Sequence, residues 1–397
     1  MIYVYYMKDD MAVVQDVELS KQMGNITTDG SLEYIPRDEI LKLSKIIQIR
    51  GINRVINNVT AEDIKRAMTK YKLLLGKEVE IEPYKGFLKL KRYITNDKCI
   101  KIPDIVDIIG NMTFHNNRCI EKVICNNDLT HIGYDAFSDC KNLKEVKLTS
   151  SIECIGLKAF YDTGIEYIEI PEGVSRMGIS CFEKCFNLKE INLPSTVTEI
   201  EADCFKDCEK LESVDISKTS VEGLKIAFAG CTNLKRVKLN KGLKTIGYSC
   251  FENCESLEEI ELPESLEEII HDSFFNTGIK SIRIPKNVKR IGSTAFAVCN
   301  NLESVVIEAS IEKLNDAFKD CVKLKSIILP EGLREIDKNS LSNSRIETIR
   351  IPDSVEFMDL DAFHGCKYIK EISIKKSDDI YIRGDKHSDI YRKIVWR

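Results

Sequence analysis

A phenylalanine recurs along most of the chain at a nearly constant interval, and no other feature constrains the fold as strongly. Successive members of this column stand 22 or 23 residues apart, and leucine takes the place once. The members are Phe114, Phe137, Phe160, Phe182, Phe205, Phe228, Phe251, Phe274, Phe296, Phe318, Leu341 and Phe363. A fixed period of roughly 20 to 29 residues is typical of a solenoid, in which each repeat forms one coil that packs only on its neighbours.

The sequence around each phenylalanine follows one pattern, I-G-x-x-A-F-x-x-C-x-x-L-x-x-V-x-L, as in IGYDAFSDCKNLKEVKL at residues 132–148. This pattern resembles the BspA-like leucine-rich repeats of bacteria and some protists. The resemblance extends over residues 99–375 and implies an α/β solenoid of about 12 leucine-rich repeats with a parallel, concave β-sheet. It does not identify a partner, because one fold serves many functions.

Each slot of the repeat has a physical role. The V-x-L part has period two and predicts a short strand whose inward side chains stack on those of the next repeat. The A-F part predicts about one helical turn, which brings residues four apart to one face. Glycine follows the isoleucine in half the copies, as at Gly133 and Gly156, and we expect positive φ there.

Eleven of the fifteen cysteines occupy two slots of the repeat. Cys181, Cys204 and Cys250 take the alanine slot, and the other eight stand three residues after the phenylalanine column. Those eight are Cys140, Cys185, Cys208, Cys231, Cys254, Cys299, Cys321 and Cys366. Because Ala, Ser, Thr or Asn fill the same slots elsewhere, we interpret the thiols as a cysteine ladder that packs the core, without a cofactor or a metal. A metal or redox role is the alternative, since stacked cysteines would lie near disulfide distance.

The outward position just before each predicted strand carries a charge whose sign alternates from repeat to repeat. The column is Glu121, Lys144, Glu166, Lys189, Glu212, Lys235, Glu258, Lys280, Glu303, Lys325, Glu347 and Lys370. If the strands stack in register, every charge has opposite neighbours on both sides. We therefore interpret this column as a device that specifies register rather than as a binding site.

The best candidate for a contact centre lies in the middle column of the predicted sheet. Val306 and Ile328 stand there in neighbouring repeats, with small serines beside them. Arg283 and Arg350 flank the pair. An apolar spot with arginine at its rim is typical of a protein contact, although scattered surface aliphatics are the simpler alternative.

A second, weaker candidate lies nearer the N-terminus. Tyr167 stands beside Lys147, Glu169 and Asn192 in the predicted sheet. Tyrosine is enriched among residues that dominate binding energy, so we expect a minor contact here.

The segments before and after the repeats differ from them. Residues 1–98 predict a small α+β N-terminal domain or cap, residues 99–375 the solenoid, and residues 376–397 a C-terminal cap. Residues 42–77 are locally basic, with nine Lys or Arg against Glu62 and Asp63. Nucleic-acid binding is conceivable there. A solvated helix face is the alternative, because no nucleic-acid motif accompanies the charges.

Composition bounds the class of protein. The net charge of −5 favours neither nucleic acid nor a membrane as the partner of the whole chain. The N-terminus lacks a signal-like apolar core, and no run of about 18 apolar residues follows it. We therefore expect a cytoplasmic protein with no membrane partner, in which the thiols stay reduced.

These observations predict a non-enzymatic scaffold that binds another protein on the concave face of the solenoid. The sequence contains no catalytic motif such as H-E-x-x-H, a P-loop or G-x-S-x-G. A surface adhesin or host-interaction protein is the first alternative, as the family resemblance implies. Nucleic-acid binding through residues 42–77 is the second.

Overall fold

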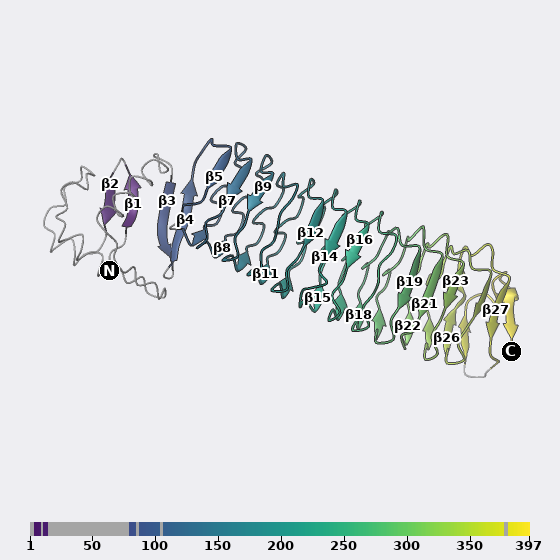
Figure 1. Ribbon diagram of the computed structural model, residues 1–397. Coiled ribbons are helices and arrows are strands. Elements are labelled where there is room, and N and C mark those ends of the chain that lie inside the picture. The colour runs from purple at the N-terminus through teal and green to yellow at the C-terminus, as the bar shows by residue number, and fades with distance from the viewer. Residues whose placement is uncertain (1–3, 9–10, 15–78, 85–86, 104–105, 377–379) are drawn as a thin grey trace.

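The structure, a computed structural model, describes residues 4–8, 11–14, 79–84, 87–103, 106–376 and 380–397. From residue 87 onward the described chain forms an elongated parallel β-solenoid of about 13 turns (Figure 1). In this view the stack runs almost straight, with two rows of short strands along it. The predicted solenoid of leucine-rich repeats is therefore confirmed.

One row contains the strands predicted from the V-x-L part of the repeat, and we call it the long-strand face. Its strands pair in parallel, in groups of three. They are β5 (Cys99–Lys101), β7 (Lys122–Ile124), β9 (Glu145–Lys147), β12 (Glu190–Asn192), β14 (Ser213–Asp215), β16 (Arg236–Lys238), β19 (Ser281–Ile284), β21 (Ser304–Ile307), β23 (Ser326–Ile328), β25 (Thr348–Arg350), β27 (Glu371–Ile374) and β29 (Ile394–Trp396).

The second row was not predicted, since we expected a single sheet. It forms where the isoleucine of the I-G pair turns inward and its neighbour outward, and we call it the short-strand face. Its parallel strands are β4 (Phe87–Tyr93), β6 (Ile108–Ile109), β8 (His131–Ile132), β10 (Cys154–Ile155), β11 (Arg176–Met177), β13 (Glu199–Ile200), β15 (Gly223–Leu224), β17 (Thr245–Ile246), β18 (Glu268–Ile269), β20 (Arg290–Ile291), β22 (Lys313–Leu314), β24 (Glu335–Ile336), β26 (Phe357–Asp359) and β28 (Tyr381–Arg383).

The predicted helical turn around each phenylalanine is wrong. Asp135 and Asp139, on either side of Phe137, have φ of 50° and 61°, which a right-handed helix does not contain. The N–H groups of Asp135, Phe137 and Asp139 donate to the carbonyls of Leu157, Ala159 and Tyr161 in the next coil, at 2.9, 2.8 and 2.9 Å. In a helix these N–H groups would donate to carbonyls of the same coil. In the tight turns they donate to the next coil and so join the coils. Helix is confined, among the described residues, to the 3-10 segments η2 (Leu360–Phe363) and η3 (Tyr391–Lys393).

The predicted positive φ at the glycine of the I-G pair is also wrong. The left-handed positions instead lie around the phenylalanines and are filled mostly by aspartate and asparagine, although residues such as Lys158, Ile226 and Val298 also occupy them. Gly133 and Gly156 serve close packing of the coils. A Cβ atom on Gly133 would lie 2.7 Å from the carbonyl carbon of Gly110, and one on Gly156 would lie 2.7 Å from the oxygen of Ile132.

The core is a continuous stack in which each coil contributes the same side chains. From Phe114 to Phe318 the rings of neighbouring coils lie nearly parallel, with centroids 4.9 to 5.6 Å apart. The rings are almost completely buried. A single coil could not bury this surface, so the neighbours on both sides are part of its fold.

The eight cysteines that follow the phenylalanines are buried beside this stack. Each donates its S–H to a main-chain carbonyl of the preceding coil, as from Cys208 to Phe182 at 3.1 Å and from Cys231 to Phe205 at 3.2 Å. The remaining six bonds of this kind measure 3.0 to 3.3 Å. A small side chain with one donor satisfies this slot, which explains why Thr and Ser also occur in it.

The ends of the solenoid are built from segments outside the repeat. β3 (Val79–Tyr84) pairs antiparallel with β4, and β4 continues the short-strand face through β6. β28 and β29 extend the two faces at the other end, so residues 380–397 add a further coil rather than only a covering. β1 (Val4–Lys8) and β2 (Met11–Val14) form an antiparallel pair. The helices expected within residues 1–98 lie outside the described residues, and the domain division stays a prediction.

Candidate functional site

The alternating charges lie along the edge of the long-strand face. In most coils that carry the lysine, it forms an ion pair with the glutamate of the preceding coil. Lys280 Nζ is 2.5 Å from Glu258 Oε2, and this hydrogen bond raises the pKa of Lys280. The same contact joins Lys235 to Glu212 at 3.3 Å, Lys325 to Glu303 at 2.8 Å and Lys370 to Glu347 at 2.7 Å. The predicted cross-strand pairs are thus confirmed in these coils, and this column neutralises itself.

The predicted contact centre lies on β19, β21 and β23. Arg283 pairs in register with Val306, and Val306 with Ile328. Ile328 is 57% exposed, whereas Val306 is only partly exposed. Ile328 therefore projects from a face on which most large aliphatic side chains turn inward.

Arg283 is held by two carboxylates rather than left available to a partner. Its Nε and Nη2 atoms donate to Glu308 at 2.9 and 2.6 Å, and Nη1 donates to Glu264 at 2.8 Å. The hydrogen bonds to Glu308 and Glu264 raise the pKa of Arg283 above its already high value. The positive charge on this side of Val306 is therefore balanced within the protein.

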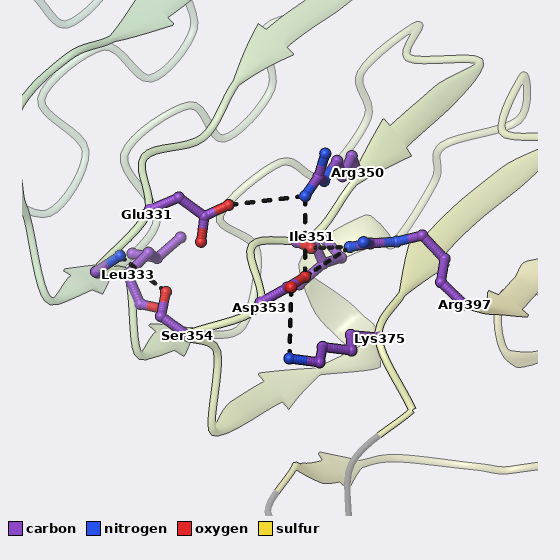
Figure 2. Close-up of polar contacts among 9 residues, drawn as sticks. Glu331, Leu333, Arg350, Ile351, Asp353, Ser354, Lys375 and Arg397 are labelled. Atoms are coloured by element: carbon purple, nitrogen blue, oxygen red, sulfur yellow. Dashed lines mark hydrogen bonds and ion pairs between the residues drawn. The ribbon is translucent and has the colours of Figure 1, made fainter.

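Arg350 is bound less tightly on the other side of Ile328. Its Nη2 atom lies 4.0 Å from Glu331 Oε1 and 4.0 Å from Asp353 Oδ1. Figure 2 shows Arg350, Lys375 and Arg397 converging on Asp353. Burial alone would raise the pKa of Asp353, but the hydrogen bond from Arg397 and the nearby cations hold it below its ordinary value. Three cations thus share the carboxylates of Glu331 and Asp353 at this rim of the spot.

Arg397 also ties the last coil to the solenoid. Its Nη2 atom donates to the carbonyl of Ile351 at 2.9 Å and contacts Asp353 Oδ1 at 3.1 Å. Its main-chain N–H donates to Ile374 at 2.8 Å. Arg350, placed at the edge of this network, is the better of the two flanking arginines for contact with a partner.

Tyr167 is 59% exposed and lies between acidic neighbours. An isolated bridge pairs it with Glu145, which contacts Lys122 at 2.7 Å and Lys147 at 3.8 Å. Asn192 donates to Glu190 Oε1 at 2.7 Å. Lys147 and Asn192 are thus engaged with the glutamates rather than gathered around the phenol ring.

The two predicted spots do not form one site. Tyr167 and Val306 are six coils apart, which is about 29 Å at the usual spacing between strands. A partner that touched both would have to follow the solenoid lengthwise.

An exposed apolar stripe escaped the sequence analysis. Met112, Tyr134, Leu157 and Ile179 are 50, 44, 41 and 39% exposed on four successive coils, at the edge that follows the short strands. Tyr134 Oη donates to Met112 Sδ at 3.9 Å. A search for apolar residues directly after the glycine of the I-G pair would have revealed Tyr134, Leu157 and Ile179, whereas Met112 stands one residue further along its coil.

A second alternating charge column was also missed. It stands before the short strands and comprises Glu222, Lys244, Glu267, Lys289, Glu312, Arg334 and Glu356. Lys244 contacts Glu222 at 2.8 Å and Lys289 contacts Glu267 at 2.5 Å. Both faces therefore carry a column of alternating charges, and a search at the same period would have identified the second one.

The remaining predictions concern segments and ligands rather than this face. The basic residues 42–77 lie outside the described part of the chain. Where the structure describes the chain, no group of three or more His, Cys, Asp or Glu side chains is arranged to hold a metal ion. The described residues contain no helix with the length and hydrophobicity of a membrane-spanning segment.

Comparison with known proteins identifies the repeat. The family model "BspA type Leucine rich repeat region" matches residues 107–225, 224–316 and 291–383. A leucine-rich repeat protein from Bacteroides ovatus is 25% identical, with 78% of this chain and 89% of that chain covered and a TM-score of 0.60.

Two other solved structures are more distant. A leucine-rich repeat protein from Eubacterium ventriosum is 18% identical, with 77% and 91% covered and a TM-score of 0.47. A leucine rich cell surface protein from Faecalibacterium prausnitzii is 22% identical, with 76% and 94% covered and a TM-score of 0.45. No curated protein matches the chain. The family model spans more than two thirds of the 397 residues, and the chain belongs to the BspA-type leucine-rich repeat family.

Proposed function

We propose that the protein is a non-enzymatic scaffold that binds another protein on its long-strand face, around Ile328. Leucine-rich repeat proteins generally serve as non-enzymatic interaction scaffolds or act at surfaces. The observation that carries the finer proposal is the exposure of Ile328, at 57%, beside Val306 on a face whose edge charges are largely paired. The cytoplasmic location expected from the sequence stays a prediction.

The surroundings of Ile328 favour one kind of partner. Val306 adds apolar surface on one side, and Ser326 beside them is small enough to let a partner side chain approach. Arg350 lies on the next coil, where its nearest carboxylates, those of Glu331 and Asp353, are 4.0 Å away. A partner that presents an apolar side chain next to a carboxylate would bury Ile328 and pair with Arg350.

The test compares partner recovery by matched surface variants. We expect Ile328→Asp to reduce recovery of the specific partner at least about tenfold, because it places a charge in the apolar centre of the contact. Tyr248→Asp is the control, since Tyr248 is 58% exposed but follows a short strand. The measurement is quantitative affinity purification from the native host, followed by binding of the purified partner.

Arg350→Glu distinguishes the predicted partner chemistry from simple apolar contact. We expect it to weaken binding and to reduce its dependence on salt, because the attraction to a carboxylate is replaced by repulsion. Equal recovery by the Ile328→Asp variant and the unaltered protein would contradict the proposal.

A further inference from the structure

Two cysteines of adjacent coils face each other inside the core. The sulfur atoms of Cys181 and Cys204 are 3.3 Å apart and hydrogen-bonded to each other. Both side chains are completely buried, in the slot that alanine fills in several other coils. This is a different pair from the stacked column that the sequence pointed to, and it goes beyond the proposed binding function.

We propose that Cys181 and Cys204 are a site of reversible disulfide formation that links two coils covalently. With hydrogen peroxide as the oxidant, each thiol gives up one proton and one electron, the S–S bond forms, the O–O bond breaks and two water molecules leave. The sulfurs need to approach from 3.3 Å to about 2.0 Å, the length of a disulfide bond. Coils stacked at about 4.8 Å place the two Cα atoms within the usual disulfide range.

The neighbouring cysteines are less suited to this reaction. The S–H groups of Cys208 and Cys231 point to main-chain carbonyls, at 3.1 and 3.2 Å. A disulfide between these two would give up both hydrogen bonds inside the core. Cys181 and Cys204 give up only the hydrogen bond that joins them, and the new covalent bond replaces it.

Burial determines which reagents reach the pair. Desolvation raises the pKa of Cys181 and of Cys204, so both thiols stay protonated in the closed core. Thiolates are the reactive form, so we expect slow oxidation by a small neutral peroxide during local opening of the coils. Cys99 and Cys119 are exposed and would react first.

The experiment uses the full chain with Cys99→Ser and Cys119→Ser, which removes the exposed thiols. The folded protein is treated with hydrogen peroxide, the remaining thiols are alkylated in denaturant, and the peptides are identified by mass spectrometry with and without reductant. We expect a reducible peptide that joins Cys181 to Cys204, at least about tenfold more abundant than any that joins Cys208 to Cys231.

Alanine variants provide matched controls, because alanine already occupies this slot in other coils. Cys204→Ala should abolish the linked peptide, whereas Cys250→Ala should leave its yield unchanged. Similar yields for the two cysteine pairs would overturn the proposal. So would a Cys181–Cys204 peptide that appears only after the protein has been unfolded.

Discussion

At the scale of single residues, the buried thiols combine two properties that the repeat needs. Cys231 fills a small apolar space and donates its S–H to Phe205 of the preceding coil at 3.2 Å. Thr277, in the same slot, donates to Phe274 at 3.1 Å and also contacts Cys299 at 3.2 Å. The exchange of Cys with Thr and Ser predicted a small polar filler, but not its acceptor, which lies in the preceding coil for Cys231 and in the same coil for Thr277.

The buried thiols predict a loss of stability at alkaline pH. Burial raises the pKa of Cys250 to about 12, whereas in the unfolded chain the same thiol has a pKa of about 8.5. Its contribution to stability is therefore complete below that pH and declines as pH rises toward the folded-state value. Above about pH 8.5 each such thiol should lower the free energy of unfolding by about 1.4 kcal/mol per pH unit. The combined effect of a few such thiols is comparable to the whole stability of a domain.

Denaturant unfolding at about pH 7.5 and about pH 9.5, under reducing conditions, measures this effect. Cys250→Ala keeps the packing of the slot and removes one ionisable group. We expect the loss of unfolding free energy between these two pH values to be smaller by about 1.4 kcal/mol in this variant. An unchanged pH dependence would show that the thiol is not protected from ionisation.

The left-handed residues illustrate where residue-scale prediction stopped. Asp135 and Asp139 adopt positive φ, which aspartate tolerates better than most residues but does not reveal in sequence. The recurring glycine does have a structural reason, but the reason is close packing rather than positive φ, because a Cβ atom on Gly133 would strike the preceding coil. Only the position of the neighbouring coil separates close approach from positive φ.

At the scale of elements, each strand packs an inward side chain into the core and carries a charged residue at its edge, which we interpret as specifying register. Ile282 and Val305 pair in register and are both buried, while Lys280 stands just before the first of these strands. Lys280 pairs with the preceding coil through Glu258 and not with Glu303, which pairs with Lys325. The period-two pattern predicted the long strands. The short strands show only two residues of that pattern and were not recognised.

Reversing one charge of the column tests its role in register. Lys280→Glu would lose the contact with Glu258 and place a carboxylate between two others, so we expect the melting temperature to fall by about a few degrees at low salt. At about 1 M salt, where the screening length is about 3 Å, most of the difference should disappear. Lys286→Glu is the control, because Lys286 lies outside both charge columns. Equal effects of the two substitutions in thermal melts would argue against a specific role for the column.

At the scale of the whole molecule, the fold could be predicted because one period repeats along the chain. The phenylalanine column and the inward aliphatics defined the coil, the core and the number of turns to within about one. Residues 380–397 were not recognised as a further coil, since β28 and β29 take their places by backbone pairing with β26 and β27 rather than by a repeated sequence.

The candidate site was predictable only in outline. The repeat placed Val306 and Ile328 on adjacent strands, and the structure agrees. The arginines that flank them look alike in sequence, yet Arg283 is held by Glu264 and Glu308 while Arg350 is not held as closely. Such pairing depends on side chains that follow the strands of the adjacent coils, which a column taken along the middle of the sheet does not include.

The alternating charges give the solenoid a parity, which means that odd-numbered and even-numbered coils carry opposite charges at the same edge. Both charge columns change sign at every coil in the region around Lys280 and Lys289. Deleting residues 251–273 would remove one coil with Glu258 and Glu267, leaving Lys235 next to Lys280 and Lys244 next to Lys289. Deleting residues 251–295 removes both members of each pair and brings glutamates next to Lys235 and Lys244 instead. We expect the shorter chain of the two to melt at a higher temperature at low salt, even though it has lost more core.

That parity limits how such a chain can lengthen or shorten. A single inserted coil would satisfy the core, because every layer accepts the same phenylalanine, but it would bring like charges together at both edges. Gains and losses in even numbers avoid this conflict, so the unit that can be duplicated without electrostatic mismatch is a pair of coils, not the single repeat that the phenylalanine spacing suggests.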